Sequence, residues 1–357
     1  MIVNAAATLT ALGGSVIPEP VIAAMAEAAR SYVDLPAAYI AAGEAIAART
    51  RNEGAAVTAG ASSAITLSVA SLLTGPEPES TQIFPLRDGH AHVVMLAPQR
   101  NDYDLAVRIL GVGIREAADD AASLRAALSD ETVCVLWFAG TQYPAPGLEL
   151  SEVVAIAAER SVPVIVDAAA QIPPLSSLWR FTHESGAAAA IFSGGKGLRG
   201  PQDSAIVVGS RAITTGIQRH MAPNHGIGRG MKVTKESLAG ILAALEYAFA
   251  VDEEQLLAGY ETVVRGWLQT AQDAGLTARS DFPSEAGQPH SRAFIVFDSP
   301  ERAAEVKQLL WEREPQVAVL VVGSAIALNP QPLRPGEEAH VSAALVELAA
   351  VERAAAD

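Results

Sequence analysis

Short apolar runs alternate with segments of helical spacing along much of this chain, and this alternation limits the folds that the chain can adopt. The apolar runs lie at 55–58, 92–96, 133–138, 163–167, 189–193 and 204–208. Helix-like segments lie at 19–31, 37–50, 104–110, 121–128 and 150–160. This order predicts α/β architecture, with βα units forming a mainly parallel sheet. Ligands of such sheets bind beyond the carboxyl ends of the strands, so residues that follow each run are the first candidates for chemistry.

The pattern changes after the MKVTKE stretch. Apolar residues at one-face spacing predict a long helix that continues in some form to about Gln272. A strand at 293–297, a helix at 300–311, an apolar run at 317–322 and a closing helix from about Glu337 follow. This α+β pattern predicts a second, smaller domain. We expect an N-terminal arm at 1–18, a large domain at 19–240 and a small C-terminal domain at 241–357.

Composition narrows the class of protein. Half of the residues are hydrophobic, which suits a parallel sheet buried on both faces. The formal net charge is −15 and no block of lysines or arginines occurs, which argues against a nucleic-acid partner. A single cysteine, Cys134, excludes an internal disulfide, and the scattered histidines match no metal-ligand spacing. The first residues lack a signal-peptide pattern and no apolar stretch is long enough to span a membrane, so we expect a soluble, cytoplasmic protein.

The segment TAGASSAIT at 58–66 places a glycine at a strand end and small hydroxyl residues at a helix start. Backbone N–H groups at such a corner lack partners, and the helix dipole adds positive potential, so the corner can hold a phosphate. An ordinary N-capped helix would explain the serines equally well.

Two strand ends carry an ionisable residue. Asp167 ends the run VPVIVD, where a buried carboxylate is costly unless a positive or hydrogen-bonding group meets it. Lys196 follows the next run in the turn SGGKG, and a lysine in a partly desolvated turn can act as a nucleophile or form a Schiff base. The alternative for Asp167 is a helix N-cap. A phosphate cradle, a carboxylate and an amine in this order are the three groups that pyridoxal 5'-phosphate requires.

Several segments also resemble a known family. DAAAQIPP, FSGGKGLRGPQ, GRGMKVTKE and NPQPLRPGEE are similar to signatures of enzymes that use pyridoxal 5'-phosphate and are related to bacterial selenocysteine synthase, L-seryl-tRNA(Sec) selenium transferase. The resemblance is strongest to the short members described as D-glucosaminate-6-phosphate ammonia-lyase-like. It spans essentially the whole chain. It implies fold type I, the aspartate aminotransferase fold, in a homodimer or higher homo-oligomer whose active sites are shared between subunits.

The resemblance also implies roles for individual residues. Lys196 would carry the cofactor as a Schiff base, and Asp167 would pair with its pyridine nitrogen. The residues that would contact the phosphate or the ring are Gly60, Ala61, Ser62, Ser63, Gln171 and Ser193. Arg229 and Lys232 match a motif that would bring positive charge to the phosphate or the substrate anion. The alternative for these two residues is surface charge at a domain junction.

One position departs from the family pattern. Where related sequences often have a histidine that stacks on the cofactor ring, this chain has Gln99. A glutamine amide can lie flat on a pyridine ring, but it stacks less well than imidazole and cannot carry protons in the same way. We therefore place Gln99 among the cofactor-binding candidates and expect this change to affect the reaction.

The expected activity follows from the cofactor. The first hypothesis is a lyase of the ammonia-lyase or dehydratase type that acts on a small amino acid with a leaving group on its β-carbon. Removal of the α-proton would start the reaction. The alternatives are an aminotransferase, a racemase, an aldolase or a β-replacement transferase on the same cofactor. A non-catalytic binding protein of the same fold is a third hypothesis, and the retention of both Asp167 and Lys196 argues against it.

Overall fold

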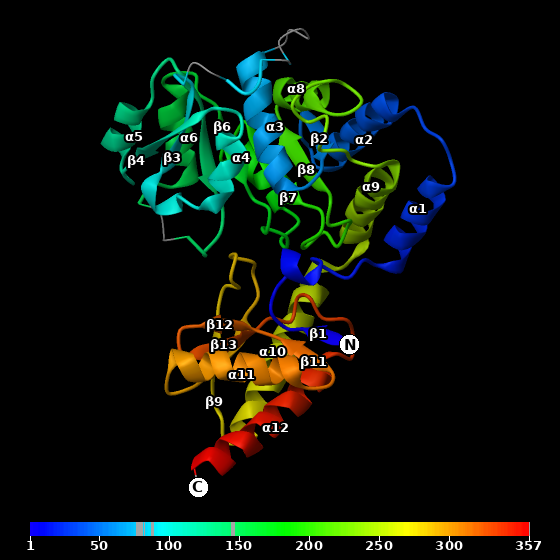
Figure 1. Ribbon diagram of the computed structural model, residues 1–357, viewed down its shortest axis with the longest axis vertical. Helices are drawn as coiled ribbons and strands as arrows, with labels where there is room; N and C mark the ends of the chain where they lie inside the picture. The colour runs from blue at the N-terminus through cyan, green and yellow to red at the C-terminus, as the bar shows by residue number, and fades with distance from the viewer. Residues whose placement is uncertain (76–80, 82, 87–88, 144–146, 357) are drawn as a thin grey trace. The chain divides into compact units, whose positions relative to one another are not determined.

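The computed structural model describes residues 1–75, 81, 83–86, 89–143 and 147–356. The chain forms two compact units, one of Ile17–Ala250 and one of Met1–Val16 together with Val251–Asp357. The larger unit extends beyond the expected boundary at 240 because helix α9 (Lys235–Ala250) packs against α1 (Glu19–Ala29). Figure 1 shows these two helices side by side. The N-terminal segment pairs with the C-terminal part of the chain, through β1 (Ile2–Asn4) and β11 (Gln316–Ala318).

A seven-stranded sheet forms the centre of the larger unit, in the order β2-β8-β7-β6-β5-β3-β4. All of its strands run in one direction except β8, which is antiparallel to both of its neighbours. The strands are β2 (Gly54–Thr58), β3 (His92–Leu96), β4 (Gly113–Ala117), β5 (Thr132–Phe138), β6 (Val164–Asp167), β7 (Ala189–Ser193) and β8 (Ala205–Gly209). Nearly all residues of the central strands are buried, which explains their continuous apolar runs.

Helices cover this sheet. Helix α3 begins just after β2 and contacts β5, β7 and β8, and α2 and α8 pack against β2 (Figure 1). The remaining helices of the larger unit are α2 (Leu35–Arg49), α3 (Ala61–Thr74), α4 (Leu105–Arg108), α5 (Ala121–Ala127), α6 (Leu150–Ala158), α7 (Ser177–Trp179) and α8 (Arg211–His220). The predicted βα order is therefore correct. The core is one continuous cluster of hydrophobic residues, mostly aliphatic with a few aromatic side chains, from the sheet and these helices.

Strand β4 was not predicted from the sequence. It lies at the edge of the sheet and pairs only with β3. Its segment GIREA exposes most of its residues and carries two charges, so it has no apolar run. Edge strands tolerate such residues because one side of the strand faces water.

The smaller unit contains an antiparallel sheet in the order β12-β13-β10-β9 and the parallel pair of β1 and β11. Its further elements are α10 (Glu253–Asp273), β9 (Thr277–Asp281), β10 (Arg292–Val296), α11 (Pro300–Glu312), β12 (Leu320–Val322), β13 (Ala325–Leu328) and α12 (Glu338–Ala356). The long helix expected to reach Gln272 is in fact two helices. Asp252 caps the start of the second helix, because its carboxylate accepts a hydrogen bond from the Gln255 N–H at 3.0 Å.

Candidate active site

The carboxyl ends of four strands meet at one edge of the large sheet. Strands β2, β5, β6 and β7 run in the same direction, so the residues that follow Thr58, Phe138, Asp167 and Ser193 lie at this edge. The sheet order separates β2 from β7 by only one strand, although the two strands are far apart in sequence. The edge therefore brings together the glycine corner after β2, the acid at the end of β6 and the lysine after β7.

Asp167 is the last residue of β6 and is only 8% exposed. Its Oδ1 accepts a hydrogen bond from the Ala169 N–H at 3.0 Å, and within the described part of the chain Oδ2 accepts none. Burial raises the pKa of the Asp167 carboxyl, and the Ala169 N–H and the positive charge of Lys196 oppose this effect. A buried carboxylate oxygen that accepts no hydrogen bond within the protein can accept one from an N–H group of a bound molecule.

Lys196 lies in the turn after β7 and is partly buried. The glycines around it are required by close approach to other segments. A Cβ on Gly194 would lie 2.1 Å from the Ser204 Oγ, and one on Gly197 would lie 2.0 Å from the Ile172 carbonyl oxygen. The glycines thus let the turn pass tightly between neighbouring segments, which holds the lysine within electrostatic reach of Asp167.

The corner after β2 has the features of an anion site. Gly60 stands before α3 with φ 90°, a conformation that favours glycine, and no side chain caps the helix. The Ser63 Oγ donates to the Ala59 carbonyl at 2.9 Å, while Ser62 is exposed. The N–H groups of the first helical turn, from Ala61 to Ser63, have no intrahelical acceptor, so they remain available to an anion.

Gln99 and Gln171 both bind the backbone at the end of β5. The Gln99 Nε2 donates to the Phe138 carbonyl and its Oε1 accepts from the Phe138 N–H, both at 3.1 Å. The Gln171 Nε2 donates to the Ala139 carbonyl at 3.3 Å. Both glutamines are buried. The structure therefore gives Gln99 a role that the sequence did not suggest, which is to connect the segment after β3 to the end of β5.

The residues predicted to bind the cofactor or the substrate also include Ser193, Arg229 and Lys232. Ser193 ends β7, and its N–H donates to the Ala169 carbonyl at 3.3 Å, so it lies next to the segment that follows Asp167. Arg229 and Lys232 are exposed on the segment after α8, and neither forms an ion pair with another described residue.

Sequence reasoning missed one residue of this edge, Tyr143. It follows β5 by a few residues and is partly buried. Burial and, to a lesser degree, the charge of Asp167 raise the pKa of its phenol. The available signal was an aromatic residue shortly after a strand end, in the segment WFAGTQY.

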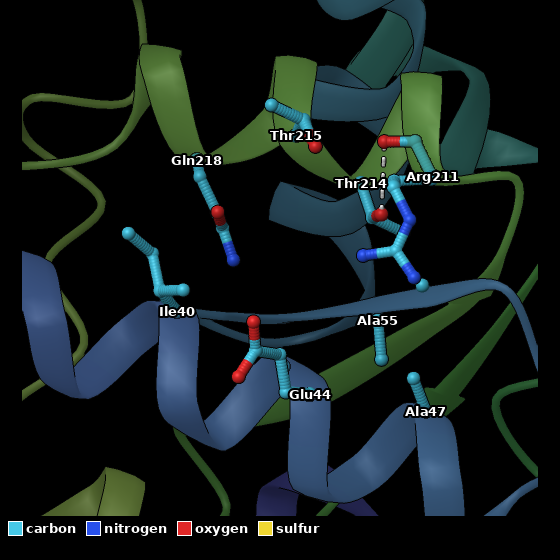
Figure 2. A pocket seen from close by; sticks show the side chains of 10 residues that line it. Ile40, Glu44, Ala47, Ala55, Arg211, Thr214, Thr215 and Gln218 are labelled. Atoms are coloured by element: carbon cyan, nitrogen blue, oxygen red, sulfur yellow. Dashed lines mark hydrogen bonds between the residues drawn. The ribbon is translucent and has the colours of Figure 1, made fainter.

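The residues at this edge fit pyridoxal 5'-phosphate. The N–H groups within the first turn of α3 suit the phosphate, the Asp167 Oδ2 suits a protonated ring nitrogen, and the Lys196 amine suits the aldehyde. A different hollow, shown in Figure 2, lies at the opposite edge of the sheet, between the start of β2 and helices α2 and α8. Glu44 and Arg211 face it, but it contains no residue of the predicted set.

Within the described ranges, no group of three or more His, Cys, Asp or Glu side chains is arranged to hold a metal ion. None of the helices in the same ranges is long and apolar enough to cross a membrane.

The architecture is that of fold type I, the fold of a large class of enzymes that depend on pyridoxal 5'-phosphate. A solved structure of D-glucosaminate-6-phosphate ammonia-lyase matches with a TM-score of 0.82 and 27% identity, covering 100% of this chain and 96% of that one. Serine palmitoyltransferase from S. paucimobilis, with bound PLP-myriocin, matches with a TM-score of 0.64 and 13% identity, over 99% of this chain and 87% of that one. The second match concerns the fold alone.

Two characterised proteins are similar in sequence. D-glucosaminate-6-phosphate ammonia lyase from Salmonella typhimurium is 29% identical over 371 residues, which cover 98% of this chain and 95% of that protein. 5'-C-glycyluridine monooxygenase-decarboxylase from a Streptomyces species is 29% identical over 367 residues, which cover 97% of this chain and 89% of that protein. No protein-family model matches the chain.

Proposed function

We propose that this chain is a lyase dependent on pyridoxal 5'-phosphate, which releases ammonia from a small amino acid that carries a leaving group on its β-carbon. The observation that carries the proposal is the buried carboxylate of Asp167 with one unfilled oxygen, within electrostatic reach of Lys196. Similarity to an ammonia-lyase over nearly the whole chain supports the reaction type.

We assign the cofactor to groups of the larger unit. The phosphate would bind the backbone of Gly60, Ala61 and Ser62, with the hydroxyls of Ser63 and Ser193 nearby. Asp167 would accept a hydrogen bond from the protonated ring nitrogen. Gln171 would approach the phenolic oxygen of the cofactor. Arg229 and Lys232, both exposed on one chain, would serve the phosphate or the substrate anion of a neighbouring subunit in a homodimer.

When bound there, the cofactor supplies an electron sink that stabilises negative charge on the substrate's α-carbon. Asp167 would hold a proton on the ring nitrogen, because a buried carboxylate favours a positively charged partner. The Lys196 Nζ would take the proton from the substrate's α-carbon as a general base. The glycine turn keeps Lys196 in place for this transfer. Loss of the β-leaving group together with that proton, followed by addition of one water to the product, would yield a keto acid and ammonia.

The finer aspects of the proposal rest on the sequence resemblance. The selenocysteine synthase signatures suggest common ancestry with that family, while the net charge of −15 argues against a tRNA substrate. We propose a homo-oligomer in the cytoplasm.

The test is a product screen. Protein loaded with pyridoxal 5'-phosphate is incubated with D- and L-serine, β-chloroalanine and aminosugar acids, and ammonia and keto acid are measured separately. We expect both products in equal amounts, and none from Lys196→Ala. Accumulation of pyridoxamine phosphate with keto acid but without ammonia would instead identify an aminotransferase.

A second candidate reaction deserves a parallel measurement because the two characterised relatives are equally similar to this chain. The Streptomyces relative is a monooxygenase-decarboxylase, so we add an oxygen electrode and a carbon dioxide assay to the screen. Substrate-dependent uptake of oxygen with release of carbon dioxide would favour oxidative decarboxylation over the lyase reaction.

A further inference from the structure

Tyr143 lies on the loop after β5, at the same edge of the sheet as Asp167. Phe138, the last residue of β5, is the register partner of Asp167, so their side chains leave the sheet on the same face. The rings of Tyr143 and Phe138 pack with centroids 5.6 Å apart and planes inclined by 54°. The Tyr143 ring is thereby held close to the carboxylate that we assign to the cofactor ring.

The hydroxyl end of Tyr143 is also held. Burial, together with the negative charge of Asp167, raises the pKa of the Tyr143 phenol to about 12, and the Gln142 side chain forms a hydrogen bond with it. The loop can take this form because residue 140 is glycine. Gly140 has φ 137°, a conformation that favours glycine. The phenol is therefore neutral at working pH, and contacts at both ends fix the ring.

The sequence predicts that Gln99 covers the cofactor ring, but in the structure its side chain binds the protein backbone. Its amide donates to and accepts from the backbone of Phe138, and the side chain is 3% exposed. An amide held at both polar atoms cannot turn to lie over a bound ring without breaking these hydrogen bonds. Any aromatic contact with the ring in this chain would therefore come from another segment.

We propose that the ring of Tyr143 packs against the pyridine ring of the cofactor, in the place that the sequence assigned to Gln99. This inference rests on the proposed function, because it assumes that pyridoxal 5'-phosphate binds between Asp167 and Lys196. Stacking needs only the flat face of the ring, so the hydroxyl serves to orient Tyr143 through Gln142.

The experiment measures binding of pyridoxal 5'-phosphate to the cofactor-free full-length protein by absorbance titration. Tyr143→Leu is expected to raise the Kd about tenfold, whereas Tyr143→Phe keeps the ring and is expected to stay within about twofold of the wild type. Tyr32→Leu, the same change at a fully exposed tyrosine of the larger unit, is the matched control and should leave the Kd unchanged. If Tyr143→Leu does not fold, as judged by circular dichroism, Tyr143→Asn replaces it.

The outcomes separate the two proposals. If the wild type itself does not bind pyridoxal 5'-phosphate, the proposed function fails. If the wild type binds it and Tyr143→Leu or Tyr143→Asn binds equally well, only the stacking role fails. A tenfold loss in Tyr143→Phe would also overturn the stacking role, because the hydroxyl and not the ring would then be the important group.

Discussion

Replacing Gln99 with leucine tests how the end of β5 is held. Strand β3 pairs with β5 only as far as Val135, and beyond that point the Gln99 amide supplies the missing neighbour to the N–H and C=O of Phe138. Leucine has a similar volume but no polar atoms. The change therefore leaves two buried backbone groups without a partner while it preserves the packing.

The expected magnitude follows from these two hydrogen bonds, each of 3.1 Å. A buried backbone group that loses its partner costs about 1–3 kcal/mol, so two groups cost about 2–6 kcal/mol. Burial of the leucine side chain returns about 1–2 kcal/mol of this. We expect Gln99→Leu to lower the free energy of unfolding by about 2.5 kcal/mol, the middle of a range of about 0–5 kcal/mol.

The assay is urea unfolding of the cofactor-free protein, combined with hydrogen exchange at the Phe138 amide. The exchange measurement reports on the larger unit specifically, even if the two units unfold separately. Gln269→Leu, at an exposed glutamine that bonds to Asp273, is the control and should change stability by less than about 0.5 kcal/mol. An unchanged Phe138 exchange rate in Gln99→Leu would refute the reasoning. A loss of cofactor affinity with unchanged stability would restore the original hypothesis that Gln99 covers the ring.

Three further changes test the remaining parts of the site. Lys196→Ala should lower the rate of ammonia release by about 10²–10⁴-fold, and borohydride should no longer attach the cofactor to the chain. Because burial raises the pKa of Asp167, stability of the cofactor-free protein should fall as pH rises through that pKa. Asp167→Asn should lack this fall, so the difference between the two urea-unfolding free energies should grow from acidic to neutral pH. Gly60→Ala meets no atom within 4 Å but forces φ 90°, so it should cost about 1–3 kcal/mol in thermal unfolding and weaken phosphate binding.

The central strands and their order along the chain were predictable from the sequence. Continuous apolar runs such as HVVML and AAIFS correspond to β3 and β7, whose limits match those predicted. The prediction succeeded because burial on both faces of a parallel sheet requires uninterrupted apolar residues, which is a local property. Edge strands such as β4 have no such requirement, and the sequence did not reveal them.

The candidate site was predictable only in part, for the same reason. Asp167 and Lys196 stood out because each is an ionisable residue at the end of an apolar run, and the chain alone determines that pattern. The tertiary structure decided that Gln99 binds the Phe138 backbone and that Tyr143 lies near Asp167. These relations depend on which strands become neighbours and on how each loop turns after its strand. Pairing between segments far apart in the chain leaves no periodic trace in the sequence, so only the folded protein could decide it.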